Sequence, residues 1–233
     1  MKAQSRVLII GILLMGSAYT LFATPAQSWL FLNLNTELSE KETASVQVWD
    51  RDYNKEDKKQ HLYFINLAYK RAISKNTKAY AGVFNMFYVQ ESKADALELS
   101  GNDFELRPWQ GLYHKVGKIG QTSVGSFTRL EERFIYKNNY DFDLRFRERL
   151  SLAQPIGKKL GLKVTSEILI NLDDDASGRL FAPQEMRHCL SFNMKVYDSL
   201  KVEAGYGVFL KNKADNHGIW IVSMNYLFSP WSR

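Results

Sequence analysis

The chain has 233 residues, of which 45% are hydrophobic and 24% charged, and its formal net charge is +6. Acidic and basic residues alternate along the sequence instead of clustering, which argues against a nucleic-acid-binding surface. A single cysteine, Cys189, excludes an intrachain disulfide. An exported protein of this composition must therefore be held by its core or by the closed hydrogen-bond ladder of a barrel.

The first 26 residues have the three parts of a secretory signal. Lys2 and Arg6 form a basic start, an apolar stretch continues to Ala23, and Thr24-Pro25-Ala26 supplies small residues for a signal peptidase. The alternative is an uncleaved anchor, because the apolar stretch is close to the lower limit for a spanning helix. We predict a signal peptide over residues 1–26 and a mature domain over residues 27–233. Loss of the two basic residues would change the net charge from +6 to +4.

After the leader, apolar and polar residues alternate with a period of two, and no long stretch has helical spacing. The alternating runs last roughly a dozen residues, which is long for soluble strands and sufficient to cross a tilted bilayer. Candidate strands, in chain order, are 29–38, 43–53, 60–73, 78–90, 103–116, 121–137, 140–154, 158–171, 182–196, 199–212 and 216–228.

The connections between these strands alternate in length. Tight turns are expected near residues 39–41, 74–76, 117–118, 154–157 and 197–198, and the longer polar connections at 54–59, 90–102 and 172–181. Short periplasmic turns and long external loops are typical of outer-membrane barrels. Counted back from a periplasmic C-terminus, all of the tight turns fall on the periplasmic side.

We therefore expect an all-β protein, an antiparallel transmembrane β-barrel of about ten strands. Bacterial single-chain barrels have even strand numbers, so the eleven candidates become ten if the segment at Trp29 is not a separate strand, or twelve if one strand is missed. Pro108 cannot donate a ladder hydrogen bond, which predicts a bulge in its strand.

The strand at 140–154 shows which face carries which residues. Its apolar positions (Leu144, Phe146, Leu150 and Leu152) alternate with charged ones (Asp143, Arg145, Arg147 and Arg149). An arginine at mid-bilayer costs roughly 2–4 kcal/mol, so the apolar set should meet lipid and the charged set the lumen. Glu148 falls on the apolar face, which predicts either an interfacial position or a bulge.

Other strands carry a weaker signal. In 60–73 the two faces are Tyr63, Ile65, Leu67 and Tyr69 against Phe64, Asn66 and Lys70. Aromatic residues near strand ends are expected to form interfacial girdles. They are Tyr80, Tyr88, Trp109, Tyr113, Tyr136, Trp220, Tyr226 and Trp231.

In so narrow a barrel, rows of charged residues should form ion pairs, because an unpaired buried charge is very costly. The predicted lumen network consists of Arg129, Glu131, Arg133, Arg145, Arg147, Arg149, Glu167, Glu185, Arg187 and Glu203. Two interpretations remain open: a structural plug that holds the barrel's shape, and a narrow porin-like pore for small solutes. Surplus arginine would make such a pore favour anions.

Evidence for an enzyme is thin. The four histidines (His61, His114, His188 and His217) have no metal-ligand spacing. Asp173-Asp174-Asp175 followed by Ser177-Gly178 lacks the full calcium-loop pattern. We predict no cofactor, metal or catalytic residue. One rival is an outer-membrane enzyme acting on lipid or lipopolysaccharide, whose Ser-His-acid residues would converge only in space. A second rival is a soluble periplasmic β-sandwich or lipocalin-like binding protein.

Several short motifs occur together in a characteristic order. They are Arg107-Pro108-Trp109-Gln110, residues 129–134, Leu144-Arg145-Phe146-Arg147, residues 167–171, 184–187 and 202–206, and Asn216-His217. This run resembles the Gram-negative outer-membrane barrel family known as domain of unknown function 2490. The resemblance implies a β-barrel fold and adds no reaction. We expect a location in the cell outer membrane, with membrane lipid, lipopolysaccharide and the barrel assembly machinery as partners and a small solute as a further one.

Overall fold

The structure is a computed structural model that describes residues 27–55, 58–91, 97–136, 140–172, 183–211 and 217–228. The predicted signal peptide and the acidic segment at Asp173–Asp175 lie outside these ranges, so neither prediction is tested. None of the described residues belongs to a helix long and apolar enough to cross a membrane.

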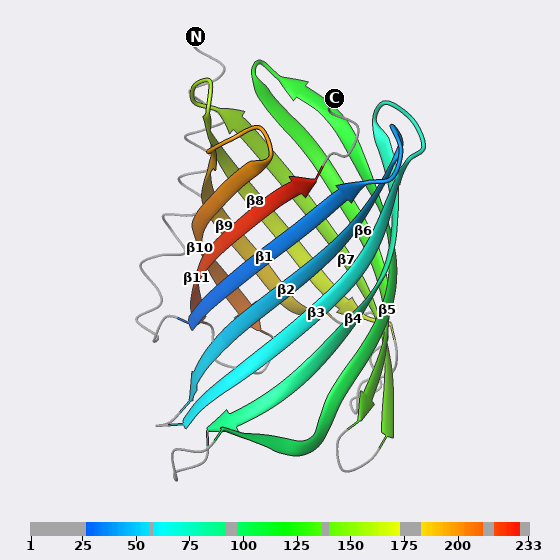
Figure 1. Cartoon of the computed structure of the whole chain (residues 1–233), viewed down its shortest axis with the longest axis vertical. Coiled ribbons are helices and arrows are strands. Elements are labelled where there is room, and N and C mark those ends of the chain that lie inside the picture. The colour runs from blue at the N-terminus through cyan, green and yellow to red at the C-terminus, as the bar shows by residue number, and fades with distance from the viewer. Residues whose placement is uncertain are drawn as a thin grey trace.

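The described residues form one closed β-barrel of eleven strands (Figure 1). The strands are β1 (Gln27–Glu37), β2 (Glu42–Lys55), β3 (Lys58–Ala72), β4 (Thr77–Glu91), β5 (Leu97–Ile119), β6 (Thr122–Tyr136), β7 (Tyr140–Pro155), β8 (Leu160–Asn171), β9 (Pro183–Lys195), β10 (Leu200–Lys211) and β11 (His217–Phe228). Each pairs in antiparallel fashion with its neighbour in sequence, and β1 closes the barrel against β11. The all-β barrel expected from the alternation is confirmed.

The closing pair explains why the predicted strand counts of ten and twelve are both wrong. The segment at Trp29 is a full strand, in which Trp29 pairs with Arg51 of β2 and with Ile221 of β11. Successive antiparallel strands reverse direction, so the eleventh runs the same way as the first and the closing pair is parallel. The even-number rule applies when the closing pair is also antiparallel. As a consequence, β1 and β11 begin at the same end of the barrel, and both finish at the other end (Figure 1).

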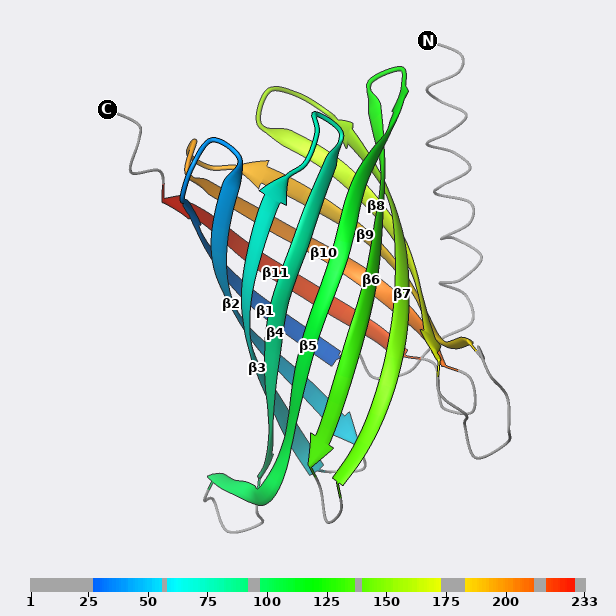
Figure 2. The same cartoon turned by 90° about the vertical axis from the view of Figure 1, so that its right-hand side faces the viewer.

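All the tight turns lie at one end of the barrel, which we call the turn end (Figure 2). Short backbone hydrogen bonds close them, such as Leu38 N to Glu42 O at 3.0 Å. The turn between β5 and β6 falls at Gly120, later than the predicted 117–118, because β5 continues to Ile119. Gly120 has a φ of 62°, a left-handed conformation that favours glycine in a two-residue hairpin.

The bulge predicted at Pro108 is absent. Leu106 pairs with Phe134 and Trp109 with Glu131, so the β5–β6 register is the same on both sides of the proline. The pairing of β5 shifts register at two other places. One is in its ladder with β4, between Phe87 and Val89, and the other is in its ladder with β6, between Lys115 and Gly117. The missing N–H of Pro108 interrupts the β5–β6 pairing without adding a residue to it. Glu148 is not a bulge either, because the β6–β7 register runs continuously past it.

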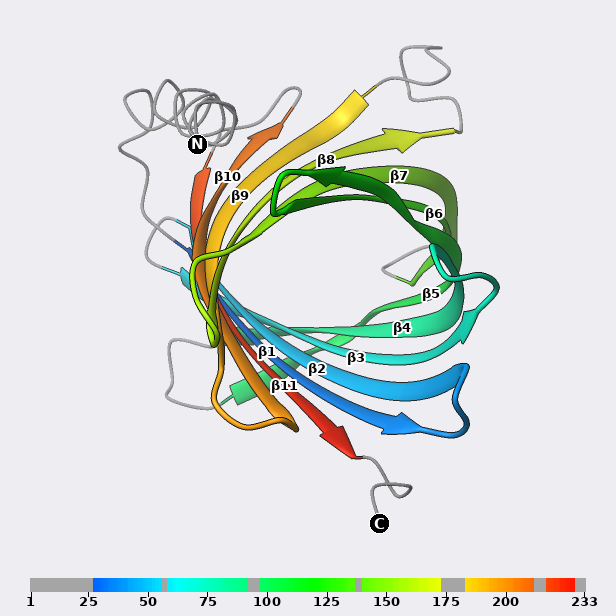
Figure 3. The ribbon, with the colours of Figure 1, turned by 90° about the horizontal axis from the view of Figure 1, so that it is seen from above.

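Side chains alternate between the barrel's interior and its outer surface. Seen from above, the strands surround that interior (Figure 3). On β7, Asp143, Arg145 and Arg147 are buried inside. On β3, where the sequence signal is weak, Phe64 is 2% exposed and Ile65 40% exposed. The two faces of β3 are therefore an inner set around Phe64 and Asn66 and an outer set around Ile65 and Leu67.

Large aromatic residues fill the side of the interior formed by β1 to β5 and β10. The buried ones are Trp29, Phe64, Phe84, Trp109 and Phe209, with Trp49 packed against them. Tyr80 also packs there, so Tyr80 and Trp109 do not belong to the predicted girdle. Trp220 does face outward, while the side chain of Tyr88 and residue Trp231 are not described. With bulky residues on both faces, these strands lose the period-two hydropathy signal.

The interior packing leaves no room for a side chain at Gly82. A Cβ there would lie 2.6 Å from the Leu67 carbonyl oxygen and 2.7 Å from the Trp109 ring. Gly82→Ala is expected to lower the free energy of unfolding by about 1–3 kcal/mol through overpacking. Gly157→Ala, in a tight turn where a Cβ would meet nothing within 4 Å, is the matched control and should change stability little. Denaturant unfolding in micelles, followed by tryptophan fluorescence, compares the two.

Candidate functional site

A fully buried carboxylate lies inside the barrel, on β6. Glu131 of β6 is 0% exposed and forms ion pairs with four guanidinium groups. Arg147 approaches to 2.9 Å and Arg107 to 3.5 Å, and Arg129 and Arg145 complete the set. Three neighbouring strands, β5, β6 and β7, are thereby joined through one side chain.

A second buried carboxylate, Glu105 of β5, extends the cluster towards the end opposite the tight turns. It pairs with Arg107 at 2.6 Å and with Arg133 at 2.7 Å. Arg133 also reaches Asp143 of β7 at 2.5 Å. Each guanidinium here has a carboxylate partner, as burial of charge requires.

A third carboxylate, Glu167 of β8, carries the cluster around the wall. It pairs with Arg147 at 2.7 Å and with Arg187 of β9 at 3.5 Å. Arg187 in turn contacts Glu185 at 2.5 Å. The ion pairs therefore form one continuous network from β5 to β9.

The structure brings eight of the ten predicted lumen residues into this network. They are Arg129, Glu131, Arg133, Arg145, Arg147, Glu167, Glu185 and Arg187. Glu203 pairs with Lys163 instead, and Arg149, which lies opposite Glu167 in the β7–β8 register, forms no ion pair with a carboxylate among the described residues. Glu105, Arg107 and Asp143 belong to the network and were not predicted as site residues. Glu105 and Arg107 occupy alternate positions, so the period-two signal could have found them.

Arginine side chains also stack on the aromatic residues of the interior. The Arg51 guanidinium carbon lies 3.6 Å from the Trp29 ring centroid and 4.3 Å from that of Phe64. Arg129 lies 5.0 Å from the Trp109 ring. Such cation–π contacts are worth more when water is excluded. They tie the charged part of the interior to the aromatic part, which the sequence analysis did not foresee.

A cavity of about 440 Å³ lies between this packed layer and the turn end. We call it the vestibule; its wall includes Lys70, Arg149, Lys163, Cys189 and Glu203. Lys163 Nζ lies 2.7 Å from a Glu203 carboxylate oxygen, and Ser191 Oγ donates to the same carboxylate at 2.6 Å. The vestibule takes in Arg149 and Glu203, the two predicted residues that the network leaves out.

At the turn end itself, Lys195 forms an ion pair with Asp198, Nζ to carboxylate oxygen 2.5 Å. The hydrogen bond and positive charge of Lys195 hold the pKa of the Asp198 carboxyl below its ordinary value. This pair is exposed, so we expect it to contribute little to stability.

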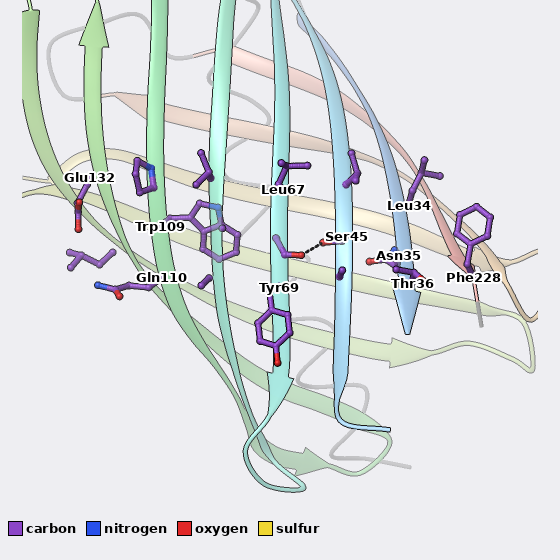
Figure 4. Close-up of a pocket in the computed structure, with 18 residues that line it drawn as sticks. Leu34, Asn35, Thr36, Ser45, Leu67, Tyr69, Trp109, Gln110, Glu132 and Phe228 are labelled. Carbon is purple, nitrogen blue, oxygen red and sulfur yellow. Dashed lines mark hydrogen bonds between the residues drawn. The ribbon is translucent and has the colours of Figure 1, made fainter. Parts of the chain in front are cut away.

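The outer surface has a shallow groove of about 740 Å³ across β1 to β6 (Figure 4). Leu67 and Ala81 belong to its apolar lining, and Gln110 and Glu132 mark its polar side. Nearby on the same surface, Glu148 accepts hydrogen bonds from Ser126 and Thr128, each at 2.5 Å. The lone outward carboxylate of β7 is therefore satisfied by its neighbours.

Two observations bear on metal-binding and catalytic groups in the part of the chain that the structure describes. The described residues contain no cluster of three or more potential metal ligands among histidine, cysteine, aspartate and glutamate. On the outer surface, His114 Nδ1 lies 3.0 Å from Thr77 Oγ1, and neither residue contacts a carboxylate within the described ranges. The described interior presents fixed charges that can bind or exclude solutes.

Comparison with known proteins agrees with the resemblance seen in the sequence. No curated protein matches the chain. The family model described as "Protein of unknown function (DUF2490)" matches residues 26–218, which include β1 to β10 and the whole interior network. The chain therefore belongs to the DUF2490 family of proteins of unknown function.

Proposed function

We propose that this protein is an integral β-barrel of the Gram-negative outer membrane whose lumen is closed at mid-height by the Arg/Glu network. The closed lumen makes the protein a shape-holding barrel and not a general diffusion pore. The observation that carries the proposal is the inverted distribution of side chains: ion pairs buried inside, aliphatic and aromatic residues exposed outside.

The outer surface supports a lipid environment. Leu30 is 53% exposed, Leu150 54% and Trp220 58%, and they lie on different strands around the barrel. Soluble monomers rarely expose large continuous apolar surfaces. A lipocalin-like binder in water would need the opposite arrangement, with a polar exterior, so the soluble alternative is disfavoured. A closed barrel also satisfies the backbone groups that lipid cannot.

Strand length supports the same environment. The shortest strand, β1, has 11 residues and β5 has 23. About 9–11 tilted residues cross the hydrocarbon core of a bilayer. Every strand is long enough to span it.

Burial of the network supports a closed lumen. Arg107, Arg129, Arg145 and Arg147 are each at most 8% exposed, and Glu105 and Glu131 are fully buried. Aromatic residues fill the adjoining part of the interior, where the Trp109 ring lies 5.0 Å from the Arg129 guanidinium carbon. A water-filled channel would leave some of these charged groups hydrated.

Conductance measures whether the lumen is closed. The purified protein, reconstituted in planar bilayers, is expected to give no stable channel openings in molar potassium chloride. A general porin measured in parallel is the control for insertion and current. Stable openings would contradict the closed lumen. Openings that prefer anions would instead support the narrow porin-like pore.

The orientation can be read from labelling of intact cells. If the tight turns are periplasmic, Tyr140 at the start of β7 faces outside and Asp198 in a tight turn faces the periplasm. In a Cys189→Ser background, a membrane-impermeant maleimide should label Tyr140→Cys on intact cells and Asp198→Cys only after lysis. Tyr140 is 59% exposed, so poor access does not limit its labelling. The reverse pattern would invert the proposed orientation, and labelling of neither site without lysis would place the protein elsewhere.

A further inference from the structure

We infer that the vestibule is a binding site for a small anionic solute with an apolar body, of the class of aryl phosphates and aryl carboxylates. The inference goes beyond the proposed shape-holding barrel. It uses the folded interior and does not depend on the membrane in which the protein resides.

Basic side chains outnumber acidic ones on the vestibule wall. Seven arginine or lysine side chains line it, against two carboxylates, those of Glu167 and Glu203. Both carboxylates are already engaged, Glu167 by Arg147 and Arg187 and Glu203 by Lys163 and Ser191. Four of the seven cations also have carboxylate partners, namely Arg129, Arg147, Arg187 and Lys163. Lys70 and Arg149 form no ion pair with a carboxylate among the described residues, so they leave positive charge on the wall.

Arg149 is the cation most available to a ligand. It is exposed, although it lines an interior cavity, so water reaches it there. Among the described residues no carboxylate lies within ion-pair distance of it, although Glu167 is opposite it in the β7–β8 ladder. Its guanidinium carbon lies 5.2 Å from the Phe127 ring centroid. Arginine is suited to bidentate recognition of carboxylate and phosphate groups.

The other side of the vestibule is aromatic. Trp29, Phe31 and Trp49 line it, and Phe31 and Trp49 pack edge to face with centroids 4.6 Å apart. Trp29 is only 4% exposed, and neither its Nε1–H nor that of Trp49 has an acceptor among the described residues. A buried donor without an acceptor is costly. A ligand oxygen would satisfy such a donor while the apolar body packs on the rings.

The size and the floor of the cavity define the ligand further. A volume of about 440 Å³ lies within the range of small-molecule sites, which excludes a macromolecular anion from its interior. Arg129 and Arg147 contribute to both the vestibule and the buried network, so the network forms the floor. A solute that enters is retained there and not passed through.

Cys189, the single cysteine, lines the vestibule and serves as a reporter of its charge. In detergent-purified protein, we would compare its modification by 2-sulfonatoethyl and 2-trimethylammonioethyl methanethiosulfonate, each corrected for its reactivity with free cysteine. The anionic reagent is expected to react about tenfold faster, since a cleft lined by one sign of charge concentrates its counter-ion. Cys189→Ser controls for modification elsewhere.

Protection of Cys189 tests the ligand class. Phenyl phosphate should slow the labelling, inorganic phosphate should do so only at higher concentration, and phenol and benzylammonium should not. Arg149→Gln should weaken protection by phenyl phosphate about tenfold through loss of a charge-assisted hydrogen bond. Lys75→Gln, the same charge change in a tight turn outside the vestibule, should leave protection unchanged.

Several outcomes would overturn the inference. One is equal or faster reaction of the cationic reagent; another is protection by phenol or benzylammonium equal to that by phenyl phosphate. If neither reagent reacts, titration calorimetry with phenyl phosphate decides: heat that disappears in Arg149→Gln supports the site, and absence of heat contradicts it.

Discussion

Replacement of Glu131 by glutamine is expected to lower the free energy of unfolding by about 3–5 kcal/mol, which is the usual cost of removing one partner of a buried ion pair. The reason is the geometry around this carboxylate, where four guanidinium groups meet one fully buried acid. Glutamine has nearly the same shape, so the loss is one of charge and not of volume. Denaturant unfolding in micelles and heat-dependent gel mobility would measure the effect.

Two variants make this prediction specific to the network. Glu132→Gln removes the neighbouring carboxylate, which faces the outer groove, and should change stability by less than about 1 kcal/mol. Glu131→Gln leaves four guanidinium groups without this carboxylate, and adding Arg129→Met removes one of them. The double variant should recover part of the lost stability, because the two residues are in contact and their effects do not add. Full tolerance of Glu131→Gln would show that the ion pairs do not hold the interior together.

A lysine on the outer surface should be far more costly than a lysine inside the barrel. Ile65 lies near the middle of β3 and is 40% exposed on the outside. Ile65→Lys is expected to destabilise the protein in bilayers by about 2–4 kcal/mol, the cost of a basic side chain at the lipid midplane. Reversible unfolding from lipid vesicles gives the value.

Ala68→Lys, three residues along β3, is the matched control. Ala68 lines the vestibule, where a lysine can reach water, so the change in stability should be about 1 kcal/mol or less. In a water-soluble barrel the ranking would reverse, because an exposed lysine in water costs almost nothing. Equal stability of Ile65→Lys and the wild type would therefore contradict a lipid-facing exterior.

Every strand of the barrel that the structure describes was located from the sequence, although alternation is weak on the aromatic-rich strands β1 to β5. All eleven candidate segments became strands, including the one at Trp29 that the even-number rule put in doubt. The closure could not be predicted in this way, because the pairing of β1 with β11 joins segments almost the whole chain apart. Turn chemistry likewise misplaced the end of β5, because the turn predicted at residues 117–118 lies inside a strand that continues to Ile119.

The candidate site was predictable where one face of a strand was charged. On β6 to β9 the alternating arginines and glutamates could be placed on one face from sequence alone. Which ones touch depends on register: Arg147 and Arg149 share that face, yet Arg147 bridges Glu131 and Glu167 while Arg149 faces the vestibule. On β1 to β5 both faces are bulky, so the aromatic side of the interior had no readable signal.

The most direct test of the account is contact between the outer surface and lipid. Trp220 is outward and 58% exposed, whereas Trp29 and Trp109 are buried inside. In a Trp231→Phe background reconstituted into vesicles, lipids brominated on their acyl chains should quench the fluorescence of Trp220, and Trp220→Phe should remove the quenched fraction. Fluorescence unaffected by brominated lipid, or quenching that persists in Trp220→Phe at full strength, would contradict a barrel whose apolar exterior faces the membrane.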